Sequence, residues 1–207
     1  GLGLLVGGGG LVVIRTTRSM LARDDLAHLV APEVGDGGHV AETALRATDP
    51  AFSREQFLAR VQHLVAKLAP QTPLDDLHPF ISDGLYQRLR TQERLGDQPR
   101  APFAESVVKA ALITRHAVTA AYDQLTVRAT VVSAGREQTF HLSFLRRRGA
   151  RTQPTDLTQN RCPQCGAPLA LTATQRCAHC EAIVNSGAYD WVLCELSPGV
   201  HHLGRAQ

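Results

Sequence analysis

The chain has 207 residues, 43% of them hydrophobic, so it is long enough to bury a substantial core. Its 22 basic and 19 acidic residues give a formal net charge of +3, too small a bias to indicate nucleic-acid binding by itself. Only 5% of the residues are aromatic, so the core must consist mainly of Leu, Val, Ala and Ile.

The first 14 residues, GLGLLVGGGGLVVI, carry no charge, and Arg15 and Arg18 follow them closely. Crossing a bilayer takes about 20 apolar residues, so this stretch alone is too short. It is either a flexible Gly-rich leader or the last turns of a membrane helix that begins upstream. Because basic residues after an apolar segment are typical of the cytoplasmic side, we favour one N-terminal anchor over residues 1–18. The rest of the chain is then expected on the cytoplasmic side.

Helices are predicted in the first half of the chain. Residues 19–30 read as a short amphipathic helix within a helical linker over residues 19–48, whereas VAETALRATDP predicts no single element. In SREQFLARVQHLVAKLAP, Ser53 and Gln56 form a capping box ahead of one apolar stripe. This stripe consists of Phe57, Val61, Leu64, Val65 and Leu68. A further helix is expected in SDGLYQRLRTQERLG, with its Ser or Asp as the N-cap and its last Gly as the C-terminal stop.

The hydrophobic period then changes from helical to two, which predicts strands. The predicted strands are residues 105–118, 125–132, 139–147 and 188–196, with turns at 119–124 and 133–138. Helices followed by a meander of strands indicate an α+β domain, in which helices pack on a curved antiparallel sheet. Tyr189, Trp191 and Leu193 are expected to share one face of the last strand. No internal repeat is visible in the sequence.

Four cysteines form two C-x-x-C pairs, Cys162 with Cys165 and Cys177 with Cys180. Such pairs can place four thiolates at the corners of a tetrahedron, the geometry that zinc prefers. Disulfides, a redox pair and a four-thiolate iron site are the alternatives, and the spacing does not exclude iron. A closed four-cysteine site leaves no position for water, so we expect one structural zinc ion rather than a catalytic one.

The surroundings of the cysteine pairs differ. A glycine follows CPQC, where a positive φ is often needed, whereas CAHCEA has none, so the second turn is expected to be looser. His179 is expected to be solvated rather than a metal ligand. Cys194 lies outside both pairs and is expected to be a buried thiol of the core.

Five motifs between Asp49 and Leu196 carry a family resemblance: DPAFSREQFL, DDLHPFISDGLYQRL, FLRRRGARTQP, CPQCGAPL and GAYDWVL. Together they resemble bacterial Tim-forty-four-like proteins, relatives of the matrix-side tether subunit of the mitochondrial inner-membrane protein translocase. A subset of bacterial members carries a zinc ribbon between the last two strands, and the segment from CPQCGAPL to CAHC is similar to it.

The resemblance implies a fold like that of nuclear transport factor two, a cone of helices over a curved antiparallel sheet, here over residues 49–207. It places an inserted zinc ribbon at residues 150–187, before the last strand, and implies an N-terminal hydrophobic anchor. In mitochondrial relatives this domain is implicated in binding anionic lipid and import partners. The region that recruits the chaperone there lies N-terminal to the domain and has no counterpart in these residues, so import-motor function is not expected.

The leading hypothesis is a non-catalytic, membrane-tethered adaptor that docks onto a membrane protein or complex, with anionic lipid as a further candidate partner. The predicted lipid or partner contacts are four arginines of RRRGAR: Arg146, Arg147, Arg148 and Arg151. A solvated strand end is the simpler interpretation of this cluster. Nucleic acid is not expected as a partner, and self-association is left open.

Two alternatives place function elsewhere. An enzyme could use the cavity of the cone, with Asp190, His116, His141 and Tyr122 as candidate catalytic residues. No second carboxylate has a matching spacing, however, so catalysis is not expected. Nucleic-acid binding could use Arg161 and Arg176 near the cysteines, but no aromatic residue lies between the cysteines for base stacking.

Overall fold

The structure is a computed structural model that describes residues 37–153 and 157–199. The chain divides into two compact units, and all described residues belong to the second, Glu33–Gln207. The predicted anchor at 1–18 and the predicted helix at 19–30 lie outside the described residues. Among the helices that the structure does describe, none is long and apolar enough to cross a membrane.

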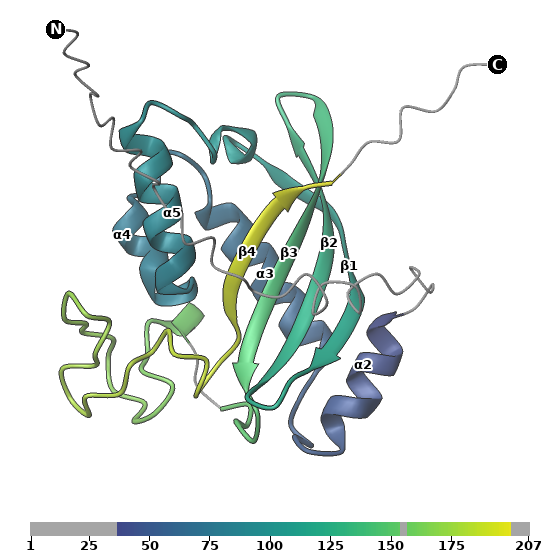
Figure 1. Cartoon of the computed structure of the whole chain (residues 1–207), viewed down its shortest axis with the longest axis vertical. Coiled ribbons are helices and arrows are strands. Elements are labelled where there is room, and N and C mark those ends of the chain that lie inside the picture. Colours follow the sequence, from purple (N-terminus) through teal and green to yellow (C-terminus); the bar gives the residue numbers. More distant parts are fainter. Residues whose placement is uncertain (1–36, 154–156, 200–207) are drawn as a thin grey trace, which may run out of the picture. The chain divides into compact units, whose positions relative to one another are not determined.

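Helices precede a four-stranded antiparallel sheet, which confirms the predicted α+β class (Figure 1). The helices are α2 (Gly37–Arg46), α3 (Arg54–Lys67), α4 (Leu74–Leu77) and α5 (Asp83–Arg94), with 3-10 turns η1 (His78–Phe80), η2 (Ala101–Phe103) and η3 (Leu157–Gln159). The strands are β1 (Val107–Val118), β2 (Tyr122–Ser133), β3 (Arg136–Arg147) and β4 (Val192–Pro198), in the order β1-β2-β3-β4. Figure 1 shows α3 running across one face of the sheet and α2 beside β1.

The helix ends follow the predicted caps. The Ser53 hydroxyl accepts a hydrogen bond from the backbone N–H of Gln56, and α3 begins at the next residue after Ser53. Ser82 caps α5 in the same way, by accepting from the N–H of Leu85. Gly96 follows α5 with a φ of +88°, a conformation that glycine adopts without steric cost.

The core lies between the helices and the inner face of the sheet. The apolar stripe of α3 is buried, as predicted, and it meets a row of side chains from the strands. The fully or almost fully buried apolar members from the sheet are Ile113, Leu125, Val127, Ala129, Val131, Leu142, Phe144 and Leu193. These apolar side chains fill the inner face of the sheet, where they pack against the helices.

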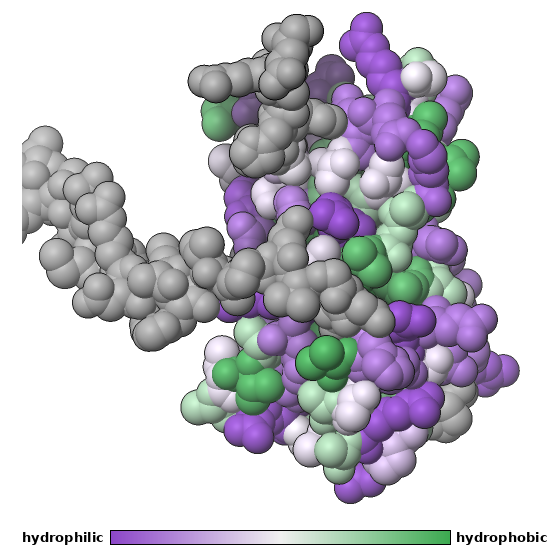
Figure 2. Space-filling view, turned by 90° about the vertical axis from the view of Figure 1, so that its right-hand side faces the viewer, coloured by the Kyte–Doolittle hydropathy of each residue, from purple (hydrophilic) through white to green (hydrophobic). Residues whose placement is uncertain are grey.

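The side of the molecule that carries β1 and α2 is mostly hydrophilic, with apolar residues scattered over it (Figure 2). Val40 on α2 and Val107 and Val118 on β1 are exposed. β1 also contains two irregularities, next to Lys109 and Thr114, which interrupt its pairing with β2. Irregularities and a lysine are features that discourage strand pairing at a sheet edge.

Three local predictions need correction. VAETALRATDP forms most of α2, because Ala41 and Leu45 are buried against the core. The turn predicted over 133–138 is only two residues long, since Ala134 and Gly135 both have positive φ, as a tight hairpin requires. The last strand begins at Val192, not at residue 188.

The late start of β4 has a cause in the tertiary structure. The Asp190 carboxylate accepts the N–H of Trp191 (2.8 Å) and pairs with Arg60 on α3, so this stretch bonds to the helix layer instead of to β3. Trp191 and Leu193 are both buried in the core, but only Leu193 lies in the strand, so the prediction that they share one face of it with Tyr189 is wrong. Tyr189 is half-buried and lies outside the strand.

Candidate metal centre and binding groove

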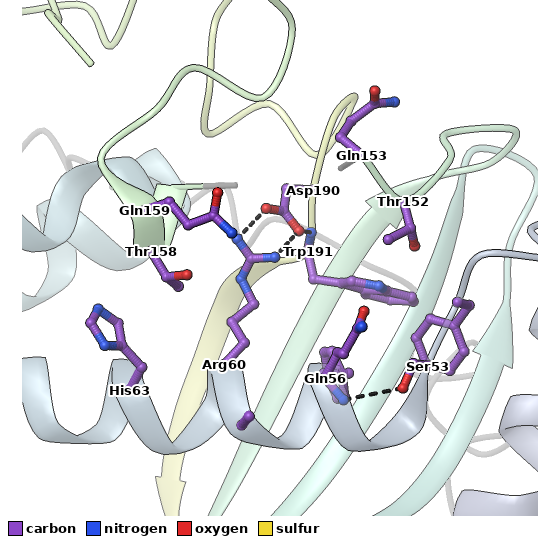
Figure 3. Close-up of a pocket in the computed structure, with 13 residues that line it drawn as sticks. Ser53, Gln56, Arg60, His63, Thr152, Gln153, Thr158, Gln159, Asp190 and Trp191 are labelled. Atoms are coloured by element: carbon purple, nitrogen blue, oxygen red, sulfur yellow. Dashed lines mark hydrogen bonds and ion pairs between the residues drawn. The ribbon is translucent and has the colours of Figure 1, made fainter. Parts of the chain in front are cut away.

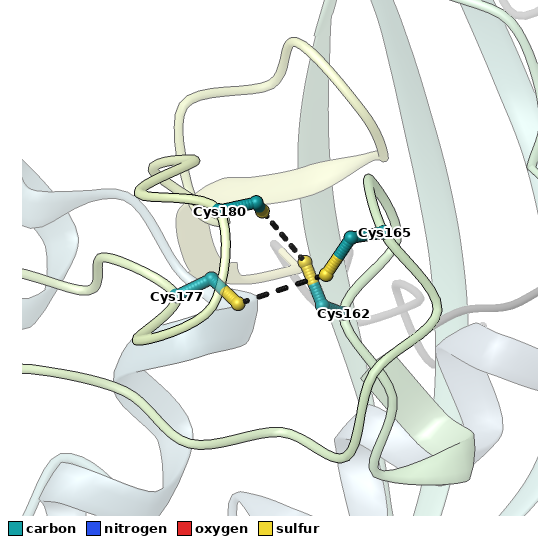
Figure 4. A group of neighbouring side chains, drawn as sticks. All are labelled: Cys162, Cys165, Cys177 and Cys180. Carbon is teal, nitrogen blue, oxygen red and sulfur yellow. Dashed lines mark hydrogen bonds between the residues drawn. The ribbon is translucent and has the colours of Figure 1, made fainter.

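The four cysteines of the two C-x-x-C pairs converge on one point (Figure 4). All four sulfur atoms lie within 4.8 Å of one another. Two separations that join one pair to the other are 3.8 Å between Cys162 Sγ and Cys180 Sγ and 3.9 Å between Cys165 Sγ and Cys177 Sγ. A tetrahedral site with metal–sulfur bonds of about 2.3 Å has sulfur–sulfur edges of about 3.8 Å. The cluster can therefore hold a metal ion.

The first cysteine of each pair faces inward. Cys162 and Cys177 are buried, whereas Cys165 is exposed and Cys180 is half-buried. Burial opposes ionisation, but hydrogen bonds from the backbone N–H groups of His179 and Cys180 lower the pKa of the Cys177 thiol to about 7. The lowered pKa favours the thiolate, which is the form of cysteine that metals bind.

Both C-x-x-C turns, which we call the first knuckle (162–167) and the second knuckle (177–182), have the same hydrogen bonds. In the first knuckle, the N–H of Cys162 donates to the carbonyl of Ala167 (2.9 Å), and the N–H of Gly166 donates to the carbonyl of Cys162 (2.8 Å). In the second, the N–H of Cys177 donates to the carbonyl of Ala182 (2.9 Å), and the N–H of Glu181 donates to the carbonyl of Cys177 (2.8 Å). The residues four positions on are Gly166 (φ +70°) and Glu181 (φ +60°). The second knuckle is thus not looser, although a non-glycine residue in this conformation costs about 1–2 kcal/mol.

The matching hydrogen bonds extend beyond the knuckles into a structural repeat of 15 residues. Residues 157–169 and residues 172–184 share the same backbone features. We call residues 157–184 the cysteine segment. Three features match between the halves. Asn160 and Gln175 both have positive φ, and each half has an antiparallel β-bridge, Arg161–Pro168 in the first and Arg176–Ile183 in the second. A backbone hydrogen bond also recurs, from Leu169 N–H to the Asn160 carbonyl and from Val184 N–H to the Gln175 carbonyl. This repeat is not visible in the sequence, because its two halves share few residue types.

The cysteine segment is attached to the start of α5. Asn185, directly after it, donates from Nδ2 to Asp83 Oδ1 (2.9 Å) and to the carbonyl of Ile81 (3.3 Å). Within the segment, Gln175 Nε2 lies 3.1 Å from His78 Nδ1. The hydrogen bond from His78, with that from Asn185, holds the pKa of Asp83 below its usual value against the effect of burial. These contacts join the metal centre to the helix layer.

The basic cluster RRRGAR divides into one buried and three exposed arginines. Arg146 is 1% exposed, donates from Nη1 to Asp49 Oδ2 (2.6 Å), and lies 4.7 Å from the ring centre of Trp191. Thr152 donates its N–H and its hydroxyl to the same carboxylate oxygen. The predicted lipid or partner contact of Arg146 is thus wrong, because its guanidinium is enclosed. Arg147, Arg148 and Arg151 are exposed, and their predicted contact stays a prediction.

An open groove of about 470 Å³ lies between α3 and the chain on either side of the cysteine segment (Figure 3). Arg60 reaches from α3 to the Asp190 carboxylate and binds both of its oxygens, while the ring of Trp191 forms part of the wall. Six neutral hydrogen-bonding side chains also line the groove: Ser53, Gln56, Thr152, Gln153, Thr158 and Gln159. The sequence did not single out this groove, because Arg60 and Asp190 are 130 residues apart.

The predicted catalytic candidates do not form one site. Asp190 is the partner of Arg60, while His116 lies on β1 and His141 lies on β3, with β2 between them. Tyr122 is opposite Arg147 in the register of β2 and β3. His116 Nε2 lies 3.6 Å from Asp123 Oδ1, which is too long for a hydrogen bond.

Cys194 lies on β4, apart from the metal centre. It is half-buried rather than fully buried, and its thiol donates to the carbonyl of Ser143 (3.1 Å). Burial raises the pKa of this thiol to about 11, which makes it a poor ligand and nucleophile at neutral pH.

Comparison with known proteins adds no family assignment. No family model matches the chain, and no match is found among curated proteins or solved structures. Function is therefore inferred from the metal centre and the groove described above.

Proposed function

We propose that this protein is a non-catalytic adaptor that is tethered to a membrane and docks onto a membrane protein or complex. The observation that carries the proposal is the groove beside α3. Its charged pair, Arg60 and Asp190, is neutralised internally, and the other polar groups that line it are amides, hydroxyls and the imidazole of His63. Such a surface suits hydrogen bonding to a segment of a partner chain.

The cysteine segment is proposed to be a zinc ribbon that is inserted before the last strand of a nuclear-transport-factor-two-like, Tim-forty-four-like domain. The four thiolates would complete a tetrahedral coordination sphere and leave no position open for water, so the ion is structural. Zinc supplies what the segment lacks, because among its residues only a few apolar side chains, such as Leu157 and Val184, reach the core. Elemental analysis distinguishes zinc from iron directly.

The membrane part of the proposal rests on the uncharged residues 1–14 of the predicted anchor and on three exposed arginines at and after the end of β3, Arg147, Arg148 and Arg151. Each basic residue close to anionic headgroups contributes about 1 kcal/mol. The domain would then lie on the cytoplasmic side, with anionic lipid as a second partner.

The test compares partner capture by two variants of α3. Gln56 lines the groove, whereas Gln62 is exposed on the same helix and does not line it. The tagged full-length protein is extracted from its native membranes in mild detergent and purified with its partners. Gln56→Arg should lose the co-purifying protein, while Gln62→Arg should retain it at the wild-type level.

Two results would contradict the adaptor proposal. One is recovery of the native protein alone in the soluble fraction. The other is equal capture by the Gln56→Arg and Gln62→Arg variants, since the groove would then play no part in docking.

A further inference from the structure

Two arginines occupy the same place in the two halves of the cysteine segment. Arg161 directly precedes Cys162, and Arg176 directly precedes Cys177. Each folds back over its own knuckle and donates from Nη1 to the carbonyl of the residue after the second cysteine. The distances are 2.9 Å to Gly166 O and 3.2 Å to Glu181 O. Repetition of this contact in both knuckles indicates that it belongs to the design of the metal centre.

The carbonyls that accept these hydrogen bonds belong to the two knuckle residues with positive φ. Such a residue fixes the direction of the peptide group that follows it. This direction determines the turn, in which both cysteine side chains point at the same position. In the first knuckle Gly166 adopts this conformation freely, whereas Glu181 in the second is strained. A hydrogen bond from Arg176 to the Glu181 carbonyl therefore holds a turn that would otherwise tend to relax.

Charge adds to this effect. Four thiolates and one divalent cation carry a net charge of −2, and the two guanidinium groups supply +2 beside them. Both arginines are exposed, so solvent and salt screen this attraction and keep its contribution modest.

We propose that Arg161 and Arg176 are positioning residues of the metal centre, which hold the knuckles closed on the ion and slow its release. This inference rests on the proposed structural metal site. It assigns to the two arginines a role inside the cysteine segment, where the alternative interpretation of the sequence was contact with nucleic acid.

The experiment measures the release of zinc from the full-length, zinc-loaded protein to an excess of a chelating dye. Arg161→Gln and Arg176→Gln should each accelerate release about threefold to tenfold, the expected effect of losing one exposed, charged hydrogen bond. The double variant should show roughly the product of the two factors. Arg151→Gln is the matched control, because Arg151 is exposed but lies outside the repeat, and it should release zinc at the wild-type rate.

Lysine variants separate positioning from general stability. Lys at 161 or 176 keeps the charge and a donor, so Arg176→Lys should recover part of the wild-type rate where Arg176→Gln does not. The fluorescence of Trp191, the single tryptophan, should be the same in all variants, since it reports the core rather than the knuckles. A variant that loads incompletely is scored by its zinc affinity in competition, with the same factors expected.

The outcomes are distinguishable. Release from the double glutamine variant within about twofold of wild type, or equal acceleration by Arg151→Gln, would overturn the arginine inference while leaving the metal site intact. Elemental analysis of the wild type is done first, and a protein without bound metal would overturn the proposed zinc site and this inference together.

Discussion

The buried ion pair between Arg146 and Asp49 yields the sharpest stability prediction. Both residues are 1% exposed, so Arg146→Met leaves the Asp49 carboxylate buried without its counter-ion. Removing one partner of a buried pair destabilises a protein by about 3–5 kcal/mol. Methionine preserves much of the length and apolar volume of the side chain, so the loss of the charge dominates the effect.

Two features of the structure bear on this magnitude. Thr152 still donates two hydrogen bonds to Asp49 in the variant, which keeps the cost from exceeding the usual range. The contact of the guanidinium with the ring of Trp191, at 4.7 Å, is lost as well, and such contacts contribute about 0.5–2 kcal/mol. We therefore expect a value near 4 kcal/mol, within the range of about 3–5 kcal/mol for buried pairs.

Urea unfolding followed by the fluorescence of Trp191 measures this cost, because the only tryptophan of the chain lies against the pair. The matched control is Arg148→Met, two residues along the chain at an exposed position, which should change stability by less than about 0.5 kcal/mol. If both variants lost less than about 1 kcal/mol, Arg146 would have to be solvated. Its assignment as a lipid contact would then stand again.

Three further predictions follow from the same contacts. Burial favours protonation of Asp49, but hydrogen bonds from Thr152 and Arg146 lower the pKa of its carboxyl below the usual 3.8. The ionised carboxylate therefore stabilises the fold fully above the unfolded-state pKa, and this stabilisation is lost as the pH falls through the folded-state pKa. Urea midpoints below about pH 4 should thus fall more steeply with pH in wild type than in Arg146→Met. Glu181→Gly should stabilise the zinc-bound protein by about 1 kcal/mol, measured by thermal unfolding, because glycine adopts positive φ without strain. A melting temperature below that of the wild type would contradict the strain argument. Chelation of the metal should accelerate amide hydrogen exchange in residues 157–184 while the sheet stays protected, and loss of protection in both would show that the core depends on the ion.

The helices and strands that could be predicted are those with a complete local signal. α3 and α5 each combine a serine cap with an apolar stripe, β2 alternates along its length, and Phe140, Leu142 and Phe144 of β3 share one buried face. α2 lacked a cap signal, and its two buried residues are fixed by the core rather than by the local sequence. The start of β4 depends on the pairing of Asp190 with Arg60, which no local pattern encodes.

The convergence of the four cysteines could be predicted because the spacing of each pair is a local signal, whereas the basic cluster was misjudged as one surface patch. A signal for Arg146 was present in the alternation of β3, since Leu142, Phe144 and Arg146 fall on the same face and all are buried. What the sequence could not supply was the acceptor, because Asp49 lies 97 residues away. An arginine that continues an apolar row of a strand is better interpreted as a buried ion-pair partner than as a surface charge.

The position of the cysteine segment in the chain connects the metal centre to the groove. Thr158 and Gln159 lie at its start, Asp190 and Trp191 lie shortly after its end, and both stretches form the groove wall opposite α3. The proposed metal ion, by closing the two knuckles, would therefore fix the distance between the two chain stretches that form this wall, without contributing an atom to it. The core does not need this restraint, because the sheet and α3 bury their apolar faces against each other. The proposed ion would thus act on the shape of the proposed binding groove, which would account for the position of the cysteine segment immediately before the last strand.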